Sequence, residues 1–381
     1  MTGLALTPFE SALAARLPTF SGLPHRRLEA WKWTDVRAAL REPMAAARET
    51  VIAPSVFANA GPFEILVMNG AADWTCAPPA GVVLAKEGAA PAFGHSLADL
   101  AAALAGETLE VAVDGDVAQP LLIRRIAGAG AVQARARVRL APGARATIIE
   151  SFDGAGAFFS NSAIHYDIGA GAHLIRIIRQ NAGEAGVETA FAGIALAEGA
   201  RLDQTALLFG GRLVRMQTHV ACDGPGARVS LRSAAALAPA RHADQTSLVA
   251  FNAAGGEARQ RHRAAVKDRA RGVFQGKFLV ARGAQKTDAD MSAGALLLSD
   301  TAEANAKPEL EIYADDVKCA HGSTAGALDE NAVFYMRQRG LSDEAARALL
   351  VEAFLGDVFD GLPAGIEHIL RGQLGRWLEA S

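Results

Sequence analysis

At 381 residues, the chain is long enough to bury a large core and to form two or three structural units. Half of its residues are hydrophobic but only 6% are aromatic, whereas alanine and glycine are abundant. This abundance of small residues favours narrow, repetitive packing over one bulky core. The formal net charge of −3 excludes a general electrostatic attraction to nucleic acid or to anionic membranes.

The first 106 residues carry a mixed pattern. Helical patterns occur within residues 1–50, including Leu28–Glu42, and Phe63–Gly70 is typical of a strand followed by a turn. Glu10 falls within the first apolar stretch and no basic segment precedes it, which is unlike a signal peptide. No uncharged stretch approaches the roughly 18 residues that a membrane span requires. We therefore expect residues 1–106 to form an N-terminal cap region, and no membrane association.

The cysteines indicate a reducing compartment. Cys76, Cys222 and Cys319 are odd in number and far apart, so they do not form a disulfide framework. Cys76 lies in a Pro-rich loop pattern and Cys222 follows an alternating strand pattern, and both are expected to be structural or incidental. We expect a cytoplasmic protein.

From about residue 107 the sequence repeats with a period of 27 to 30 residues. Gly-Ala pairs mark the repeat, starting at Gly143, Gly171, Gly199, Gly226 and Gly283, and Gly255-Gly256 falls within the last, doubled gap. Stretches that alternate between polar and apolar residues flank these pairs. In Ala134–Leu140, for example, three arginines share one face and the apolar residues share the other.

A period of this length, made of two strands and two tight turns, is typical of a β-solenoid. Glycine at each corner supplies a positive φ or a close approach of backbones, and small residues allow neighbouring turns to stack. The alternative is an antiparallel sandwich or barrel with frequent turns. The long, regular period favours a mainly β protein with a parallel β-helix core over residues 107–325, between helical N-terminal and C-terminal regions.

Residues 314–326 contain the strongest chemical candidate. Cys319 and His321 would project to the same face of an extended segment, because side chains two residues apart on a strand do so. A thiolate beside an imidazole suits zinc, copper or an iron–sulfur cluster. Two ligands do not close a structural zinc site, so other ligands must come from elsewhere, including a partner chain. The alternative is a buried cysteine and a hydrogen-bonded histidine at a strand end.

Residues 326–381 are predicted to form a helical C-terminal domain. Ser342 is a candidate N-cap with acidic residues after it, and a further helix is expected after Pro363. An apolar stripe at helical spacing comprises Ala346, Leu349, Leu350, Ala353 and Phe354. This stripe either packs against its own domain or forms a surface for a partner.

Other chemical motifs are excluded. Gly272–Phe278 has one residue too few between its glycines for a phosphate loop, and Phe278 stands where a magnesium-binding hydroxyl is required. The basic stretch Arg259–Arg271 lacks interleaved aromatic residues, which favours a solvated strand face over a nucleic-acid groove. Asp315 and Asp316 form the one local carboxylate pair, and adjacent residues on a strand point to opposite faces. These features leave a solenoid enzyme acting on polysaccharide or acyl groups, and a structural zinc-binding protein, as alternative functions.

Several segments resemble the SufB/SufD family, the scaffold subunits of the SUF system for iron–sulfur cluster assembly. They are Leu23–Asp35, Val273–Ala289, Leu296–Asp300, Lys307–Gly326 and Leu328–Ser342. The similarity spans nearly the whole chain, is most specific in Lys307–Gly326 and is loose in residues 50–130. It implies a parallel β-helix between helical ends, in agreement with the repeat.

The resemblance also implies partners and site residues. It implies a complex in which the β-helix end pairs with SufB and the C-terminal helices bind the ATPase SufC, through Ala345, Ala346, Leu349, Leu350, Ala353 and Phe354. It places His321 at the SufB interface as a ligand of a transient iron–sulfur cluster, with Cys319 as a weaker neighbour. It implies no stably bound cofactor or metal in the chain alone, and the free edge permits a homodimer when SufB is absent.

One departure indicates the SufD branch of the family. SufB subunits carry an essential cysteine shortly before the segment that corresponds to Leu296–Asp300, whereas residues 291–294 here are Met, Ser, Ala and Gly. A chain without that thiol is not expected to be the main sulfur acceptor. The sequence therefore predicts a scaffold subunit that is not an enzyme by itself.

Overall fold

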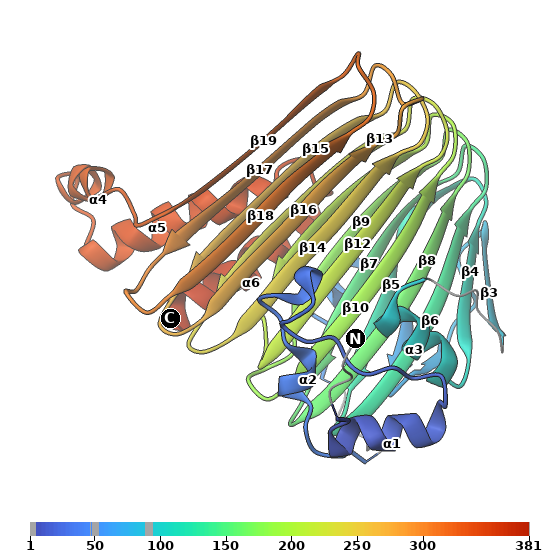
Figure 1. Ribbon diagram of the computed structural model, residues 1–381. Coiled ribbons are helices and arrows are strands. Elements are labelled where there is room, and N and C mark those ends of the chain that lie inside the picture. Colours follow the sequence, from blue (N-terminus) through green and yellow to red (C-terminus); the bar gives the residue numbers. More distant parts are fainter. Residues whose placement is uncertain (1–4, 46, 48–52, 88–93, 381) are drawn as a thin grey trace.

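The computed structural model describes residues 5–45, 47, 53–87 and 94–380. The chain forms a parallel β-solenoid with helices at both ends (Figure 1), which confirms the predicted fold class. The strands form two sheets, here called sheet 1 and sheet 2, and from residue 108 onwards they alternate along the chain between them. The predicted domain boundaries at residues 107 and 325 stay a prediction, and strands from residues 63–87 also join the two sheets.

The strands and helices have the following bounds. In spatial order, sheet 1 contains β19 (Lys318–Gly326), β17 (Asp288–Leu297), β15 (Glu257–Val266), β13 (Arg228–Leu237), β11 (Arg201–Leu208), β9 (His173–Asn181), β7 (Arg145–Gly154), β5 (Asp116–Ala127), β1 (Phe63–Met68) and β2 (Ala71–Asp73). Sheet 2 contains β18 (Glu303–Ile312), β16 (Arg271–Val280), β14 (His242–Phe251), β12 (Leu213–Cys222), β10 (Val187–Leu196), β8 (Phe158–Ile168), β6 (Gly130–Leu140), β4 (Thr108–Val113) and β3 (Val82–Glu87). The α-helices are α1 (Pro8–Arg16), α2 (Val36–Ala39), α3 (Ser96–Leu104), α4 (Glu330–Arg337), α5 (Asp343–Gly356) and α6 (Ala364–Ala380), and the 3-10 turns are η1 (Glu29–Trp31), η2 (Ala58–Ala60) and η3 (Asp357–Phe359).

The sequence repeat is the turn of the solenoid. In sheet 1, Arg201 pairs with His173 of the preceding turn and with Arg228 of the next, at separations of 28 and 27 residues. The register is parallel throughout these turns, so each side chain stacks on the corresponding side chain of the neighbouring turn.

Glycine occupies most corners of the solenoid because the backbone there adopts a positive φ, as predicted. Gly171 and Gly199 have φ angles of +65° and +62°, and no atom lies within 4 Å of where a β-carbon would be, so backbone conformation alone selects glycine there. The next residue, such as Ala172, is fully buried inside the corner. The corner at Gly283 differs, because Lys286 adopts the left-handed conformation instead, with φ +63°.

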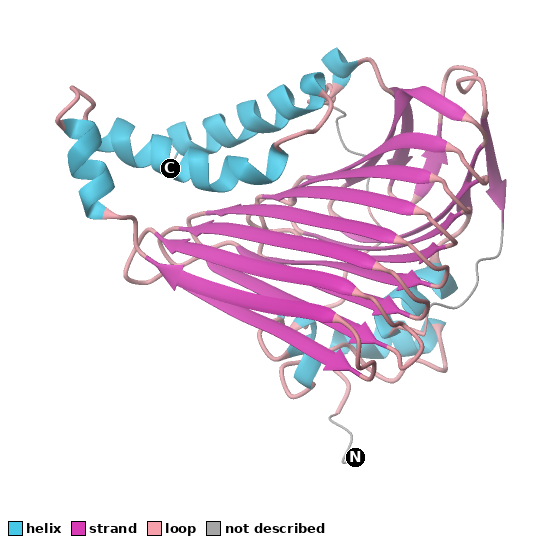
Figure 2. Cartoon of the chain, turned by 90° about the horizontal axis from the view of Figure 1, so that it is seen from above, coloured by secondary structure: helices cyan, strands magenta, loops and turns pink. Residues whose placement is uncertain are grey.

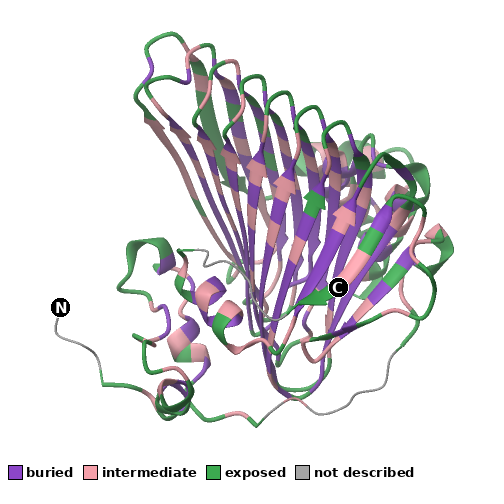
Figure 3. Ribbon diagram, turned by 90° about the vertical axis from the view of Figure 1, so that its right-hand side faces the viewer, coloured by how far each residue is buried: buried purple, intermediate pink, exposed green. Residues whose placement is uncertain are grey.

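The strands of the solenoid are largely buried (Figure 3), and the buried residues include an ionic cluster around Glu150. The Glu150 carboxylate accepts hydrogen bonds from Arg125 (2.6 Å), Arg176 (2.6 Å) and Tyr166 (2.7 Å). Burial alone would raise the pKa of Glu150, but the two guanidinium groups lower it to about 2. The carboxylate is therefore ionised at neutral pH although it is fully buried.

The N-terminal segment covers part of the outer face of sheet 2. Phe9 of α1 packs edge-on against Phe159 of β8 at 5.8 Å, and the guanidinium of Arg215 lies 3.9 Å from the ring centre of Trp31. The Thr34 hydroxyl donates a hydrogen bond to the buried carboxylate of Asp244. The helical pattern predicted over residues 28–42 is only partly realised, as η1 and α2, because the residues between them bind sheet 2 through Thr34.

The C-terminal helices lie across the outer face of sheet 1 (Figure 2). Leu355 of α5 and Leu370 of α6 are fully buried against a row of strand residues that includes Ile149 and Ile177. Ser342 caps α5 as predicted, by accepting a hydrogen bond from the amide of Ala345. Among the described residues, no helix is both long and apolar enough to cross a membrane.

The two ends of the solenoid differ. At the N-terminal end, β2 pairs antiparallel with β1, and β3 pairs antiparallel with β4, whereas the inner strands all pair in parallel. At the other end, β18 and β19 continue the parallel register to the last strand.

Candidate functional site

The candidate site lies at the open end of the solenoid, defined here as β18 and β19. In the described part of the chain, β18 pairs only with β16 and β19 only with β17. Each strand therefore presents one edge of unpaired backbone groups, a ready template for another strand. All residues of β19 except Cys319 are exposed.

Cys319 and His321 both lie on β19. In the register with β17, Cys319 is the partner of Ala289 and His321 is the partner of Met291. Ala289 and Met291 belong to the solenoid core, so the same face of β19 points towards the interior. Cys319 is half-buried against that core, and His321 is exposed because no further turn covers it.

The two side chains have different electrostatic surroundings. Burial raises the pKa of the Cys319 thiol, and the carboxylate of Asp288 adds to this effect. The thiol is thus largely protonated at neutral pH, which makes it a poorer metal ligand than an exposed cysteine. The His321 imidazole makes no hydrogen bond or ion pair with any residue that the structure describes.

The neighbouring aspartates are directed elsewhere. The Asp316 carboxylate forms an ion pair with Lys286. The backbone amide of Asp316 donates a hydrogen bond to the side-chain oxygen of Gln285 (2.9 Å). Asp316 therefore holds the last corner of the solenoid, and Asp315 is exposed beside it. Neither is bonded to His321, so no residue in the described part of the chain supplies an acceptor that orients the imidazole.

Histidine, cysteine and carboxylate side chains of the described residues do not make a complete metal site at the open end. Among the described residues, no three or more histidine, cysteine, aspartate or glutamate side chains are grouped so that they could hold a metal ion. The other two cysteines lie elsewhere: Cys222 is buried in the solenoid core, where burial raises its pKa to about 12, and Cys76 is exposed. An iron–sulfur cluster at His321 would need ligands from a second chain.

The helical residues predicted to bind a partner are divided between two faces of α5. Ala346 is fully buried, and Leu350 and Phe354 are half-buried. Leu349, which is 44% exposed, and Ala353 face solvent. The predicted stripe therefore both packs against its own domain and leaves an apolar face free.

Sequence reasoning missed two aromatic residues beside this free face. Phe334 and Tyr335 on α4 are 64% and 59% exposed. Their helix projects from the body of the protein (Figure 1), and the guanidinium of Arg347 on α5 holds it by two hydrogen bonds to the Glu330 carboxylate, of 3.0 and 2.9 Å. Their apolar character inside a short helix was visible in the sequence, but their exposure depends on the tertiary fold.

The basic stretch Arg259–Arg271 supports the C-terminal helices. Arg261 and Arg263 on the outer face of β15 pair with Asp357, at 3.4 and 3.5 Å, and Arg263 also lies 5.4 Å from the ring centre of Phe354. These two arginines thus hold the C-terminal helical region against β15 in addition to facing solvent, and the absence of a nucleic-acid partner stays a prediction. The rejected phosphate loop, Gly272–Phe278, lies within strand β16.

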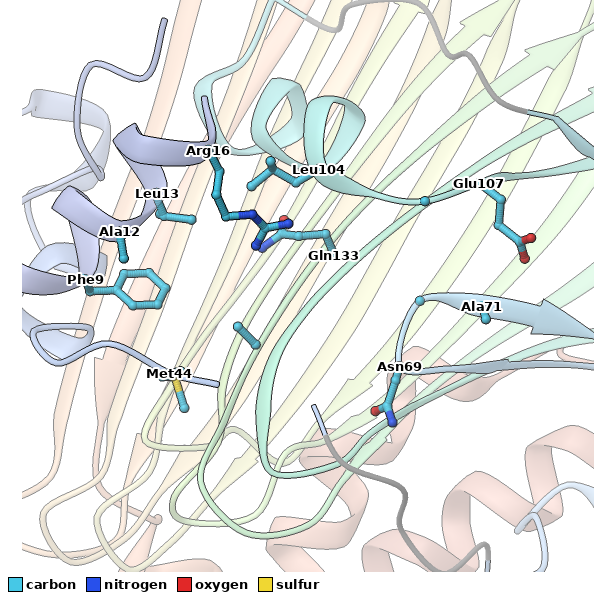
Figure 4. A pocket seen from close by; sticks show the side chains of 13 residues that line it. Phe9, Ala12, Leu13, Arg16, Met44, Asn69, Ala71, Leu104, Glu107 and Gln133 are labelled. Carbon is cyan, nitrogen blue, oxygen red and sulfur yellow. The ribbon is translucent and has the colours of Figure 1, made fainter. Parts of the chain in front are cut away.

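A separate pocket of about 560 Å³ lies between α1 and the first turns of the solenoid (Figure 4). Two of its polar groups serve the fold: Glu107 accepts a hydrogen bond from the Ala72 amide, and the oxygen of Gln133 accepts one from Asn161 (both 2.7 Å). The rest of the floor includes apolar side chains such as Leu13. The described residues that line this pocket offer no paired acid and base for catalysis.

Comparisons with known proteins point to one biological system. Residues 124–354 match the family described as "SUF system FeS cluster assembly, SufBD core domain". The chain is 32% identical over 247 residues to the iron-sulfur cluster assembly protein SufD of Escherichia coli, covering 64% of this chain and 58% of that protein. It is 33% identical over 251 residues to an iron-sulfur cluster assembly SufBD family protein of Synechocystis, covering 63% and 55%. A SufBD family protein of Mycobacterium bovis is 25% identical over 367 residues, covering 91% and 89%. The chain thus spans little more than half the length of the first two relatives.

Proposed function

This chain belongs to the SufBD family of the SUF iron–sulfur cluster assembly system, and we propose that it acts there, in the cytoplasm, as a non-catalytic scaffold subunit in the SufD role. The observation that carries this proposal is the open end, where the edge strands β18 and β19 and the exposed imidazole of His321, which bonds to no described residue, occur together. The iron–sulfur cluster is the cargo of the complex and not a resident cofactor of this chain.

SufB is the partner that we assign to the open end. The unpaired edges of β18 and β19 favour strand-to-strand pairing with another solenoid, which would satisfy their free backbone groups. In the absence of SufB, the same edges permit a second copy of this chain to pair there. A transient cluster then forms at the interface, with the imidazole from this chain and thiolate from SufB.

His321 is the ligand that this chain contributes. A metal-binding imidazole must be neutral, with one ring nitrogen free for the metal and the other held by an acceptor. No described residue occupies either nitrogen of His321, so both are available when a partner arrives. Cys319 has a secondary role, because its thiol is half-buried and has a raised pKa.

We expect His321→Ala to lower the rate of cluster maturation about 10-fold or more in the complex co-expressed with SufB and SufC. Folding and SufC binding should be unchanged, because the exposed imidazole makes no contact that stabilises the monomer. Cluster formation is followed by visible absorption, and binding by co-purification. The matched control is His368→Ala, which removes an exposed imidazole from α6. Cys319→Ser should have a smaller effect, and clusters forming at the normal rate in the His321→Ala complex would place the ligands entirely within SufB.

SufC is the partner that we assign to the C-terminal helices. The free face of α5, with Leu349 and Ala353, adjoins the exposed aromatic residues Phe334 and Tyr335 of α4. Exposed aromatic and aliphatic side chains gathered on projecting helices are typical of a protein interface. Buried Ala346 would support this face from within and not touch the partner.

Leu349→Glu is expected to weaken binding of SufC about 10-fold or more, because it places a charge in the centre of the apolar face. The binding constant is measured by titration of SufC into the purified chain. The control is Leu28→Glu, since Leu28 is 45% exposed on the N-terminal segment, next to sheet 2 and away from α5. Equal affinity of the two variants would move the docking surface elsewhere.

A further inference from the structure

Three potential metal ligands come together at the open end, although only two are close in sequence. Met291 of β17 and His321 of β19 are register partners, and Cys319 precedes His321 by two residues. Partner residues on neighbouring strands lie about 4.8 Å apart, and residues two apart on one strand lie about 6.6 Å apart. The thioether, the imidazole and the thiol thus rise from adjacent positions.

All three side chains share the interior face of sheet 1. Met291 is 1% exposed and belongs to the solenoid core, together with Ala289, the register partner of Cys319. Cys319 packs against the same core. His321 is two residues further along β19, so its side chain points to the same face of the strand. The imidazole therefore lies next to the thioether in the stacking direction, and the thiol lies two positions along β19, next to Ala289, with both at the open end of the solenoid interior.

The position of the thioether is built into the opposite sheet. A β-carbon added at Gly276 of β16 would lie 2.5 Å from the sulfur of Met291 and 2.9 Å from its methyl carbon. Any other residue at position 276 would displace the methionine. The glycine therefore gives the sulfur its place between the two sheets, beneath the last turn.

We propose that Cys319, His321 and Met291 form a binding site for a soft monovalent metal ion, Cu(I). Thiolate and thioether sulfur select Cu(I) over hard ions such as magnesium, and an imidazole completes a three-coordinate set. Zinc fits this set less well, because it needs a fourth ligand and makes little use of a thioether.

Binding involves no redox change in the protein. The Cys319 thiol releases its proton to solvent as its sulfur bonds to Cu(I), and the imidazole and thioether each donate a lone pair. The open end gives the ion direct access, because His321 is exposed and Cys319 is only half-buried.

A functional consequence follows if the proposed function is correct, and this consequence alone rests on it. Cu(I) would occupy the imidazole that otherwise serves iron at the SufB interface. Copper would then compete with cluster maturation at this subunit, and Met291 would set the affinity of the competitor without being needed for the cluster.

The test uses the purified full chain under anaerobic conditions, titrated with Cu(I) against a chromogenic Cu(I) chelator. We expect one equivalent of Cu(I) to be withdrawn from the chelator. Cys319→Ser and His321→Ala should each abolish this competition, and Met291→Leu should weaken it about 10-fold, because leucine keeps the volume and removes the sulfur. The control variant Cys76→Ser, at an exposed cysteine outside the site, should bind like the parent chain.

Two results would overturn the site: no stoichiometric binding by the parent chain, or unchanged affinity in Met291→Leu. A second measurement tests the consequence. In the complex, Met291→Leu should form clusters at the normal rate and resist added Cu(I) better than the parent. Normal cluster formation by the His321→Ala complex would remove the proposed function, whereas the Cu(I) titration of the isolated chain would stand or fall independently.

Discussion

Glu150→Ala is expected to destabilise the protein by about 3–5 kcal/mol, because it leaves two buried guanidinium groups without their counter-charge. Arg176 is 3% exposed and Arg125 is 6% exposed, so water cannot replace the lost carboxylate. Tyr166 would also lose the acceptor of its hydroxyl hydrogen bond. The midpoint of urea denaturation, followed by circular dichroism, measures the loss.

Two further variants make this prediction specific. Tyr166→Phe removes one hydrogen bond and no charge, and should lower the free energy of unfolding by only about 1 kcal/mol. This variant still tests the contribution of the buried cluster to stability if Glu150→Ala fails to fold. Glu198→Ala removes an exposed carboxylate from a corner of the same solenoid and should have almost no effect. A loss below 1 kcal/mol for a folded Glu150→Ala protein would mean that the two arginines find other partners.

Stability should fall steeply when the pH drops from 6.5 towards 4.5, because four histidines, two buried and two half-buried, are held in their neutral form. Burial lowers the pKa of His95, His219 and His242 to about 4, and nearby Arg215 contributes to each of these shifts. Burial lowers the pKa of His262 to about 3. The unfolded chain binds protons at these imidazoles near pH 6.5, and the folded chain does not.

The buried carboxyl group of Glu188 acts in the opposite direction. Burial raises the pKa of Glu188 to about 7, so the folded protein keeps a proton there that the unfolded chain has lost above pH 4.5. Between pH 4.5 and 6.5 the unfolded state therefore holds up to four extra protons and lacks one, a difference of three. This difference corresponds to a loss of stability of up to about 4 kcal/mol per pH unit on acidification.

Urea denaturation midpoints between pH 7.5 and 5.0 test this expectation. His242→Gln should reduce the slope by about one proton, because glutamine can keep a hydrogen bond to Thr34 and does not titrate. His368→Gln, at an exposed histidine, should leave the slope unchanged. A midpoint that is the same at pH 7.5 and 5.0 would show that these imidazoles are not held neutral.

The parts of the fold that were predictable depend on local chemistry. The glycine at position 171 was informative because its positive φ is disfavoured for other residues, and the constraint acts within one turn. The Ser342 cap was predictable for the same reason, since cap and helix are adjacent in sequence. Both features can be recognised from residues that are adjacent in sequence, without knowledge of distant parts of the chain.

The parts that were not predictable depend on register between distant segments. The partners Met291 and His321 are 30 residues apart, and their pairing depends on the length of the last corner, which the sequence does not mark. Likewise, nothing near Glu150 in the sequence indicates that Arg125 and Arg176 flank it from the turns on either side. The exposure of Phe334 also depends on how α4 leaves the body of the protein.

The antiparallel strands at the N-terminal end of the solenoid limit how large an assembly can grow. A solenoid with two equivalent parallel ends could stack head to tail without limit and form fibres. Here β2 spans only three residues and runs antiparallel to β1, and β3 runs antiparallel to β4. The parallel strand direction of β18 and β19 is therefore not repeated at this end, and the end does not match them as a pairing partner. We therefore expect polymerisation by edge pairing to stop at two solenoids, so that a concentrated solution of the protein contains dimers and no filaments.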